Sequence, residues 1–275
     1  MSIPSVTLND GRTIPQFGYG VWQVEDDKAA VCVHQALKDG YRLIDTAAIY
    51  GNEEGVGEGI GISGVPRSEV FLTTKLWNPQ QGQAADALDE SLAKLSTGYV
   101  DLYLIHWPTP KQDKYVQAWR TMIESQKEGK TRSIGVSNFT IDNLKRIMDE
   151  TGVVPAVNQI ELHPQLPQEE LRAFHGEHGI VTESWSPLGQ GKLLDNPVLI
   201  EIGRKYGKTP AQAVLRWHLD LGLVVIPKSV TSSRIKENID VFDFALDVDD
   251  MARLATLETG ERFGGDPVTA NYGVD

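Results

Sequence analysis

The feature that most constrains this chain is an alternation, repeated eight times, of short β-type runs and amphipathic helical segments from about residue 17 to residue 258. In the segment 84–95, for example, Leu88, Leu92 and Leu95 fall on one helical face. Parallel strands need crossover connections, which are usually helices. The alternation therefore predicts a (β/α)8 barrel, with a doubly wound sheet as the structural rival. We expect strands within residues 17–20, 41–45, 70–75, 100–106, 132–137, 156–162, 181–186 and 223–228.

Local turn and cap signals support this organisation. The turn sequence NDGR lies between SVTL and TIPQ, which predicts an opening hairpin that caps the bottom of the barrel. Thr209 followed by Pro210 is the pattern of a helix N-cap and first helical residue. Because no linker, low-complexity tract or charge block divides the chain, we expect one domain over residues 1–275.

Composition and charge narrow the possible partners and location. The formal net charge of −12 disfavours nucleic acid, since phosphate binding needs a basic surface. Cys32 is the single cysteine, so an internal disulfide is impossible and a reducing cytosol fits. The residues after Met1 lack the basic and apolar regions of a signal peptide, and no apolar run approaches the roughly 20 residues of a membrane span. We expect a soluble cytoplasmic protein.

Two patterns that suggest binding motifs do not fit their usual context. Gly59, Gly61 and Gly64 match G-x-G-x-x-G but follow a helical segment, whereas the dinucleotide fingerprint follows a strand. We expect a helix end and loop with close packing instead. His175 and His178 are three residues apart on one predicted helix, but with no further ligand nearby we expect surface residues and no metal site.

Ionisable side chains stand at the carboxyl ends of three consecutive predicted strands: Asp45, Lys75 and His106. Singly, Asp45 is explained by a helix cap, Lys75 by a solvated lysine and His106 by a core histidine. Together, at the end of a barrel where active sites form, they indicate a reaction site. The later strands bring further polar or aromatic groups to the same end: Ser137, Asn138, Gln159, Glu161, Trp185, Ser186, Lys228 and Ser229.

The chemistry of this cluster centres on Tyr50, which follows the strand that ends at Asp45. Free tyrosine has a pKa near ~10, and a neighbouring ammonium such as that of Lys75 lowers it. Asp45 supplies the counter-charge that a buried lysine needs. His106 either orients a substrate carbonyl or relays a proton. The cluster predicts acid–base chemistry on carbonyls and alcohols that needs no metal.

A basic segment near residue 230 predicts a second binding site. Lys228, Ser229, Thr231 and Arg234 surround the start of a helix, for which Ser232 or Ser233 is the expected cap. Exposed N–H groups with Lys and Arg suit a phosphate monoester, whereas an ordinary turn with solvated charges is the alternative. Trp185 suits stacking on a flat ring such as nicotinamide, with core packing as its alternative.

These segments together resemble the aldo-keto reductase family. The motifs that carry the resemblance are, in order, DTAAIYGNE at 45–53, TTKLW at 73–77, LIHWP at 104–108, GVSNF at 135–139, NQIELHP at 158–164 and IPKSV at 226–230. The likeness extends from the opening hairpin to Asn238, and within the family it is to the bacterial 2,5-diketo-D-gluconate reductase type. It implies a (β/α)8 barrel that binds NADPH without a Rossmann fold, and a monomeric enzyme.

The resemblance also implies roles for individual residues. Tyr50 would be the proton donor, completed by Asp45, Lys75 and His106. Substrate would contact Trp22, Tyr50, Trp77, His106 and Trp107, together with the C-terminal segment after Gly260, whose short form leaves the natural substrate open. The implied cofactor contacts are Gly20, Val21, Trp22, Ser137, Asn138, Gln159, Trp185, Ser186, Leu188, Gln190, Lys228, Ser229, Val230, Thr231, Arg234, Glu237 and Asn238.

The predicted function is reduction of aldehydes and ketones, of dicarbonyl or keto-sugar-acid type, by hydride from NADPH with Tyr50 as the general acid. Two other hypotheses stay open. One is an NADPH-binding sensor or partner subunit with weak turnover. The other is a metal-free hydrolase barrel using two carboxylates, for which Asp45 and Glu161 are available.

Overall fold

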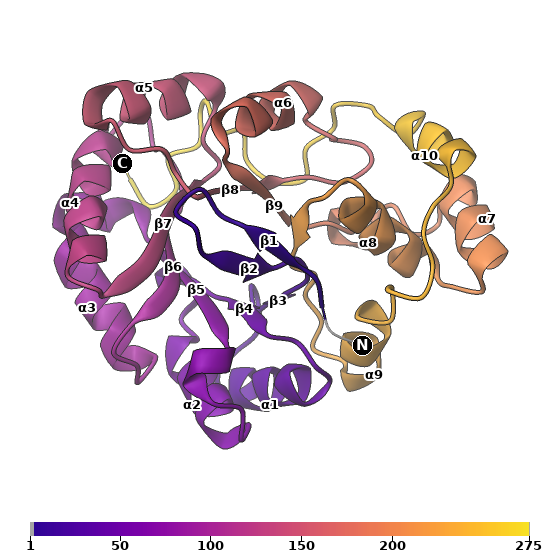
Figure 1. Ribbon diagram of the computed structural model, residues 1–275, viewed down its shortest axis with the longest axis horizontal. Helices are drawn as coiled ribbons and strands as arrows, with labels where there is room; N and C mark the ends of the chain where they lie inside the picture. The colour runs from indigo at the N-terminus through magenta and orange to yellow at the C-terminus, as the bar shows by residue number, and fades with distance from the viewer. Residues whose placement is uncertain (1–2, 275) are drawn as a thin grey trace.

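The computed structural model describes residues 3–274, so Met1, Ser2 and the last residue of the C-terminal segment, Asp275, lie outside the described residues. The chain opens with an antiparallel hairpin of β1 (Ser5–Thr7) and β2 (Thr13–Pro15), in which Val6 pairs with Ile14. Figure 1 shows this hairpin lying across one end of the strands that follow. The expected capping hairpin is confirmed.

The remaining strands form one parallel sheet whose neighbours follow the chain order. The sheet closes on itself, because Gly18 donates its N–H to the Val225 carbonyl at 2.8 Å and Val225 donates to the Gln16 carbonyl at 3.0 Å. The fold is thus a (β/α)8 barrel, and the doubly wound alternative is excluded. The strands are β3 (Tyr19–Gly20), β4 (Leu43–Asp45), β5 (Phe71–Leu76), β6 (Val100–Ile105), β7 (Thr131–Ser137), β8 (Val157–Glu161), β9 (Val181–Trp185) and β10 (Val224–Val225).

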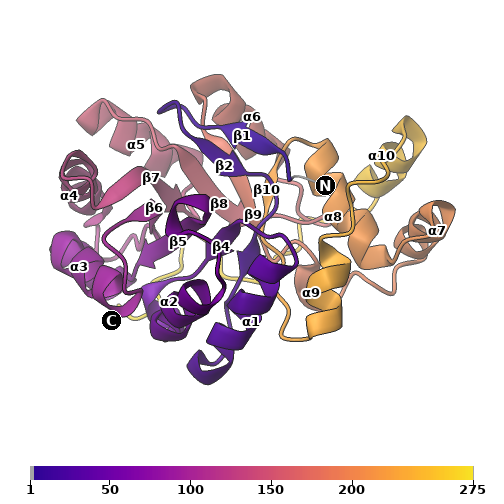
Figure 2. The same ribbon diagram turned by 60° about the horizontal axis from the view of Figure 1, so that its bottom comes forward.

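Helices surround the strands (Figures 1 and 2). Their apolar faces are those expected: Leu88 and Leu92 of α3 are buried against the barrel. The α-helices are α1 (Asp26–Lys38), α2 (Glu53–Ile62), α3 (Ala84–Lys94), α4 (Tyr115–Lys127), α5 (Ile141–Thr151), α6 (Glu169–His178), α7 (Pro197–Tyr206), α8 (Pro210–Asp220), α9 (Ser232–Asn238) and α10 (Val248–Ala255). Short 3-10 turns are η1 (Ala48–Tyr50), η2 (Arg67–Glu69), η3 (Asn78–Gln83) and η4 (Gly189–Gly191).

Local signals decide where these helices begin and pack. The Thr209 hydroxyl accepts the N–H of Gln212 at 3.3 Å, which completes a capping box at the start of α8, as predicted. Gly59 lies inside α2 against α1, where a Cβ would stand 2.7 Å from the Ala30 carbonyl oxygen. Close packing is therefore confirmed for Gly59 alone, since a Cβ on Gly61 or Gly64 would meet no atom of another segment of residues 3–274 within 4 Å. The expected helix end and loop are confirmed, because α2 ends at Ile62 and Gly64 follows in a left-handed conformation.

The expectation that His175 is a surface residue was wrong. Its side chain is buried, with Nε2 at 3.0 Å from Asn158 Nδ2 and Nδ1 at 2.8 Å from Thr182 Oγ1. Burial lowers its pKa to about 4, so the ring is neutral and structural. His178 is exposed, as expected. No group of three potential metal ligands gathers anywhere in residues 3–274, and no helix there is long and apolar enough to cross a membrane.

Candidate active site

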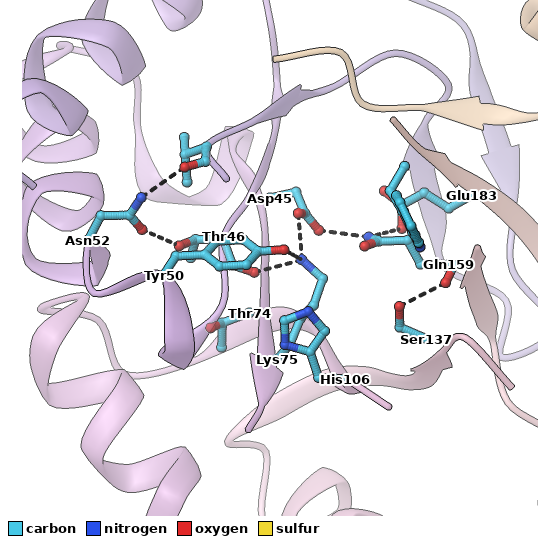
Figure 3. Close-up of polar contacts among 12 residues, drawn as sticks. Asp45, Thr46, Tyr50, Asn52, Thr74, Lys75, His106, Ser137, Gln159 and Glu183 are labelled. Carbon is cyan, nitrogen blue, oxygen red and sulfur yellow. Dashed lines mark hydrogen bonds and ion pairs between the residues drawn. The ribbon is translucent and has the colours of Figure 1, made fainter. Parts of the chain in front are cut away.

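Asp45 and Lys75 lie at the carboxyl ends of the neighbouring strands β4 and β5. Their side chains meet inside the mouth of the barrel. The Lys75 ammonium donates to Asp45 Oδ1 at 2.6 Å and to the Thr46 carbonyl at 2.9 Å, and both side chains of this ion pair are buried. Its Nζ also lies 3.4 Å from the Tyr50 hydroxyl (Figure 3). The structure therefore brings together the three groups that the sequence places at different points of the chain.

The turn that carries Tyr50 is held in place by Asn52. Gly51 follows Tyr50 with φ of 66°, a left-handed conformation that glycine adopts without a steric cost. The buried Asn52 amide then donates to the carbonyls of Val21 and Val24 at 2.9 and 2.8 Å, and its oxygen accepts the Thr46 hydroxyl at 2.8 Å. Sequence reasoning missed Asn52, although an Asn in a loop after a strand end is a recurrent signal of such anchoring.

His106 completes the cluster directly after β6. Its backbone N–H donates to the Leu76 carbonyl at 3.2 Å, which fixes its position at the strand end. The ring packs edge-to-face on Tyr50 and on Trp77, each at 5.6 Å between ring centroids. The imidazole thus stands between the phenol and the aromatic side chains of the mouth.

The electrostatics of the cluster differ in one respect from the sequence expectation. Burial raises the pKa of Tyr50 more than the Lys75 charge lowers it, so the net pKa stays above its ordinary value. Burial lowers the pKa of Lys75, but Asp45, Tyr50 and Glu183 together raise it by more, so the net pKa lies above its ordinary value and the ammonium is retained. Burial and the Lys75 charge hold the pKa of His106 well below its usual range. At neutral pH the cluster therefore contains one ion pair, a protonated phenol and a neutral imidazole.

A second buried acidic side chain, that of Glu183, adjoins the cluster, and the sequence analysis missed it. The Gln159 amide nitrogen donates to Asp45 Oδ2 at 2.8 Å and to Glu183 Oε2 at 3.0 Å, bridging the two acids (Figure 3). Burial, followed by the nearby Asp45 charge, raises the pKa of Glu183 to about 8. The only signal in the sequence is an acidic residue inside a buried strand. Both hydrogens of the Gln159 side-chain amide are therefore used, and its side-chain oxygen is left to accept a hydrogen bond from a ligand.

Three of the residues expected at the cofactor, Ser137, Asn138 and Trp185, surround this bridge. The Ser137 hydroxyl donates to the main-chain carbonyl of Gln159 at 2.8 Å, and Asn138 Nδ2 donates to the main-chain carbonyl of His106 at 3.0 Å. The Trp185 indole N–H donates to Asn138 Oδ1 at 2.8 Å. Asn138 has φ of 63°, a left-handed conformation that Asn tolerates better than most residues. These side chains form one continuous polar wall next to the ion pair.

The start of the barrel contributes its own backbone to the same wall. Gly20 lies opposite Asp45 in the β3–β4 register, and a Cβ there would stand 3.2 Å from the Ile226 carbonyl oxygen. The N–H of Val21 donates to the Asp45 carbonyl at 3.1 Å. These two positions therefore fix the backbone against which Asp45 rests.

A cavity of about 830 Å³ contains most of the other residues expected at the cofactor. Lys228 and Arg234 line it, and neither forms an ion pair within residues 3–274. Two unpaired cations on one cavity of an acidic protein favour an anionic ligand. The other expected residues on this cavity are Trp22, Ser186, Leu188, Gln190, Ser229, Val230, Thr231, Glu237 and Asn238.

The cap expected for α9 was wrong. Neither Ser232 nor Ser233 caps this helix, because both are already helical residues. Thr231 is the N-cap, with extended backbone and no side-chain cap hydrogen bond. The Ser229 hydroxyl instead accepts the N–H of Thr231 at 3.1 Å, which fixes the turn that leads into the helix.

Of the aromatic residues expected at the substrate, Trp77 packs on His106, whereas Trp22 lines the cavity of about 830 Å³. Trp22 is 43% exposed, whereas Trp107 is buried and packs edge-to-face on Trp185 at 6.4 Å. Tyr272, from the C-terminal segment, packs edge-to-face on Trp107 at 5.3 Å. Gly273 lies flat on Trp77, where a Cβ would be 3.1 Å from Cζ2. The C-terminal segment therefore completes the aromatic wall.

Comparison with known proteins agrees with this geometry. A sequence profile described as the aldo/keto reductase family matches residues 15–259. The methylglyoxal reductase DkgA of Salmonella typhimurium is 55% identical over 264 residues, covering 95% of this chain and 96% of that protein. A crystal structure of a Gox0644 mutant in complex with NADPH has 50% identity, a TM-score of 0.95 and coverage of 98% and 99%. An aldo/keto reductase structure from Brucella melitensis has 56% identity, a TM-score of 0.91 and coverage of 94% and 100%.

Proposed function

The chain belongs to the aldo/keto reductase family, and we propose from that premise that it reduces aldehydes and ketones to alcohols with NADPH. The observation that carries the proposal is the position of Lys75, bonded to Asp45 at 2.6 Å and 3.4 Å from the Tyr50 hydroxyl. A buried ion pair beside a phenol is a device for proton transfer at a carbonyl oxygen. The related proteins include methylglyoxal reductases and an NADPH complex.

The residues of the cavity fit such a cofactor. A dinucleotide phosphate has its excess negative charge at the 2′-phosphate, which the unpaired Lys228 and Arg234 match. Asn138, Gln159 and Trp185 would hold the nicotinamide end, since the free oxygen of Gln159 suits a carboxamide N–H. When bound, NADPH supplies the hydride to the carbonyl carbon.

The protein's own contribution is to deliver a proton to the carbonyl oxygen. As negative charge develops on that oxygen, the Tyr50 hydroxyl donates its proton, and the Lys75 ammonium stabilises the phenolate that remains. Asp45 keeps Lys75 charged and in place. His106, neutral because of its burial, orients the carbonyl by donating a hydrogen bond and does not act as a cationic acid. Because the pKa of Tyr50 is raised, its hydroxyl is protonated at neutral pH and can act as the proton donor.

The decisive experiment is Tyr50→Phe with NADPH and a panel of carbonyls. We expect turnover to fall by at least about a hundredfold, the range of general acid catalysis. NADPH binding, followed by its fluorescence, should persist because the phenol is not among the cavity residues. A variant with near-normal turnover would remove Tyr50 from the reaction.

Arg234 tests the choice of nucleotide. We expect Arg234→Ala to weaken the binding of NADPH by about tenfold or more and to change the binding of NADH little, since only NADPH carries the 2′-phosphate. Lys236, exposed on the same helix but not on the cavity, provides the matched control when changed to Ala. Equal losses for both nucleotides would place Arg234 away from the phosphate.

For substrates, we propose small neutral dicarbonyls ahead of keto-sugar acids. The side chains that pack around His106 and Trp107 are Tyr50, Trp77, Trp185 and Tyr272, all of them aromatic. The cation beside this wall, the Lys75 ammonium, is already paired with Asp45, so the wall suits a small neutral substrate better than a sugar carboxylate. A kinetic panel of methylglyoxal, diketones and keto acids distinguishes the classes, and higher kcat/KM for the acids would reverse this order.

The two rival functions make different predictions. A sensor or partner subunit with weak turnover would bind NADPH but oxidise it with none of the panel. A hydrolase would need Asp45 and Glu161 as a free pair, but Asp45 is bonded to Lys75 and Glu161 to the backbone of Phe263 and Gly264. The absorbance of NADPH in the presence of the panel decides among all three.

We also propose that the protein is one domain over residues 1–275 and acts as a monomer in the cytoplasm. Within residues 3–274 the exposed large apolar side chains lie on different elements and loops, as with Val31 on α1, Val230 before α9 and Val248 on α10. The single cysteine, Cys32, is buried and free, which suits a reducing compartment. Sedimentation at micromolar concentration tests the monomer, and cell fractionation tests the location.

A further inference from the structure

The C-terminal segment is held to the barrel by a buried carboxylate, that of Glu161 at the end of β8. Oε1 accepts the N–H of Phe263 at 2.6 Å, and Oε2 accepts the N–H of Gly264 at 3.1 Å. His163 Nε2 lies 3.2 Å from Oε1, and its ring stacks on Phe263 at 4.9 Å between centroids. Figures 1 and 2 show this segment on the side of the barrel opposite the hairpin. Glu161 thus fixes two consecutive backbone amides beside the active site.

The same two residues touch the expected cofactor wall. Gly264 lies against the Trp185 ring so closely that a Cβ on Gly264 would overlap its Cη2 atom. Phe263 packs on Gly189, where a Cβ would be 2.8 Å from the Phe263 ring. Gly189 begins the turn that contains Gln190, so Phe263 contacts the loop that lines the cavity of about 830 Å³. One anchored dipeptide therefore contacts both the indole and the loop.

We propose that Glu161 is a positioning residue for the cofactor, which acts through the Phe263 and Gly264 amides to hold Trp185 and the 186–191 loop. This inference rests on the proposed function, since it assumes that Trp185 and the loop contact NADPH. A carboxylate is suited to this task because its two oxygens accept both amides and the histidine N–H together. An amide side chain has one oxygen only, and its NH2 group would face a backbone N–H.

The consequence is a specific effect on cofactor retention. Loosening the dipeptide frees the indole and the loop, so NADPH should leave faster. Glu161→Gln should raise the NADPH dissociation constant about tenfold, mainly through the dissociation rate. The rate of hydride transfer in a single turnover at saturating NADPH should stay within about twofold, because the Asp45–Lys75–Tyr50 contacts do not involve Glu161.

The experiment measures NADPH dissociation by stopped-flow fluorescence for the full chain and three variants. Gly264→Ala should reproduce the faster dissociation of Glu161→Gln, since a Cβ at this position displaces the Trp185 ring while the carboxylate remains. Asp250→Asn is the matched control: this carboxylate is also buried, accepts the Tyr206 hydroxyl at 2.6 Å and lies on α10. It should lower stability without changing NADPH dissociation.

The outcomes separate this inference from the proposed function. Unchanged NADPH dissociation in folded Glu161→Gln would overturn the role of Glu161, while binding and turnover by the wild type would still support the reductase. The same change in Asp250→Asn as in Glu161→Gln would also overturn it, since general destabilisation would then explain both. Failure of the wild type to bind NADPH would overturn the proposed function itself.

Discussion

Glu183 makes the stability of this protein depend on pH in a direction that the structure determines. Its side chain is fully buried beside Asp45, to which it is linked through the Gln159 amide, and its Oε1 has no hydrogen-bond partner within residues 3–274. Burial and the Asp45 charge raise its pKa to about 8, from an ordinary value of 4.5. We predict that Glu183→Gln stabilises the protein above pH 5, increasingly as the pH rises.

The sign follows from proton linkage. Between pH 4.5 and 8 the folded state keeps the Glu183 proton while the unfolded chain has released it. Stability from this group is therefore fully present below pH 4.5 and is lost as the pH rises through 8. The loss is about 1.4 kcal/mol per pH unit for one proton, or about 2 to 4 kcal/mol from pH 5 to 8. Glutamine mimics the protonated acid, because its oxygen still accepts from Gln159 and it has no charge to lose.

The assay is urea unfolding of the wild type and Glu183→Gln at several pH values between 5 and 8.5. The difference in free energy of unfolding between the variant and the wild type should grow with pH. Taking this difference cancels the contributions of all other titrating groups. Glu161→Gln is the control on the neighbouring strand: hydrogen bonds hold the pKa of Glu161 below its ordinary value against the effect of burial. Its difference from wild type should therefore be constant over this range. A constant difference for Glu183→Gln would refute the reasoning.

Three further predictions concern the support of the site and the fold. Asn52→Ala should lower stability by about 2 to 4 kcal/mol and reduce kcat, because it removes the hydrogen bonds that hold the Tyr50 turn. Urea unfolding measures the stability and steady-state kinetics measure kcat; an unaltered kcat would show that the turn keeps its conformation without Asn52. Thr209→Ala should cost about 1 kcal/mol through loss of the α8 cap, whereas Ser232→Ala, which is not a cap, should cost little; equal losses in urea unfolding would contradict the cap assignments. Gly59→Ala should lower the free energy of unfolding by about 1 to 3 kcal/mol, because the added Cβ forces α2 away from α1. An unchanged melting temperature would contradict this and show that the two helices separate without cost.

Much of the architecture could be predicted from the sequence because its causes are local. Strand and helix periodicities lie within short segments, so the order of the elements could be read directly, and the carboxyl ends of parallel strands meet at one end of a barrel. This is why Asp45, Lys75 and His106 could be grouped from the strand pattern alone, although they are spread over 62 positions from 45 to 106. The Thr209–Pro210 cap was predictable for the same reason.

What the sequence left undecided depends on contacts between distant segments. His175 resembles any helical surface histidine until Asn158 and Thr182 are seen to enclose it. The net pKa of Tyr50 depends on how much water the whole barrel mouth excludes, which no neighbouring residue reveals.

The same holds for the two buried glutamates. Glu183 and Glu161 are both acidic residues within predicted strands, yet one is bridged to Asp45 and the other binds backbone amides about a hundred residues away. The sequence by itself determined which chemical groups reach the mouth of the barrel, because strand order and strand ends are local properties. Only the tertiary structure decided their charges and partners, because burial and hydrogen bonding are properties of the closed barrel as a whole.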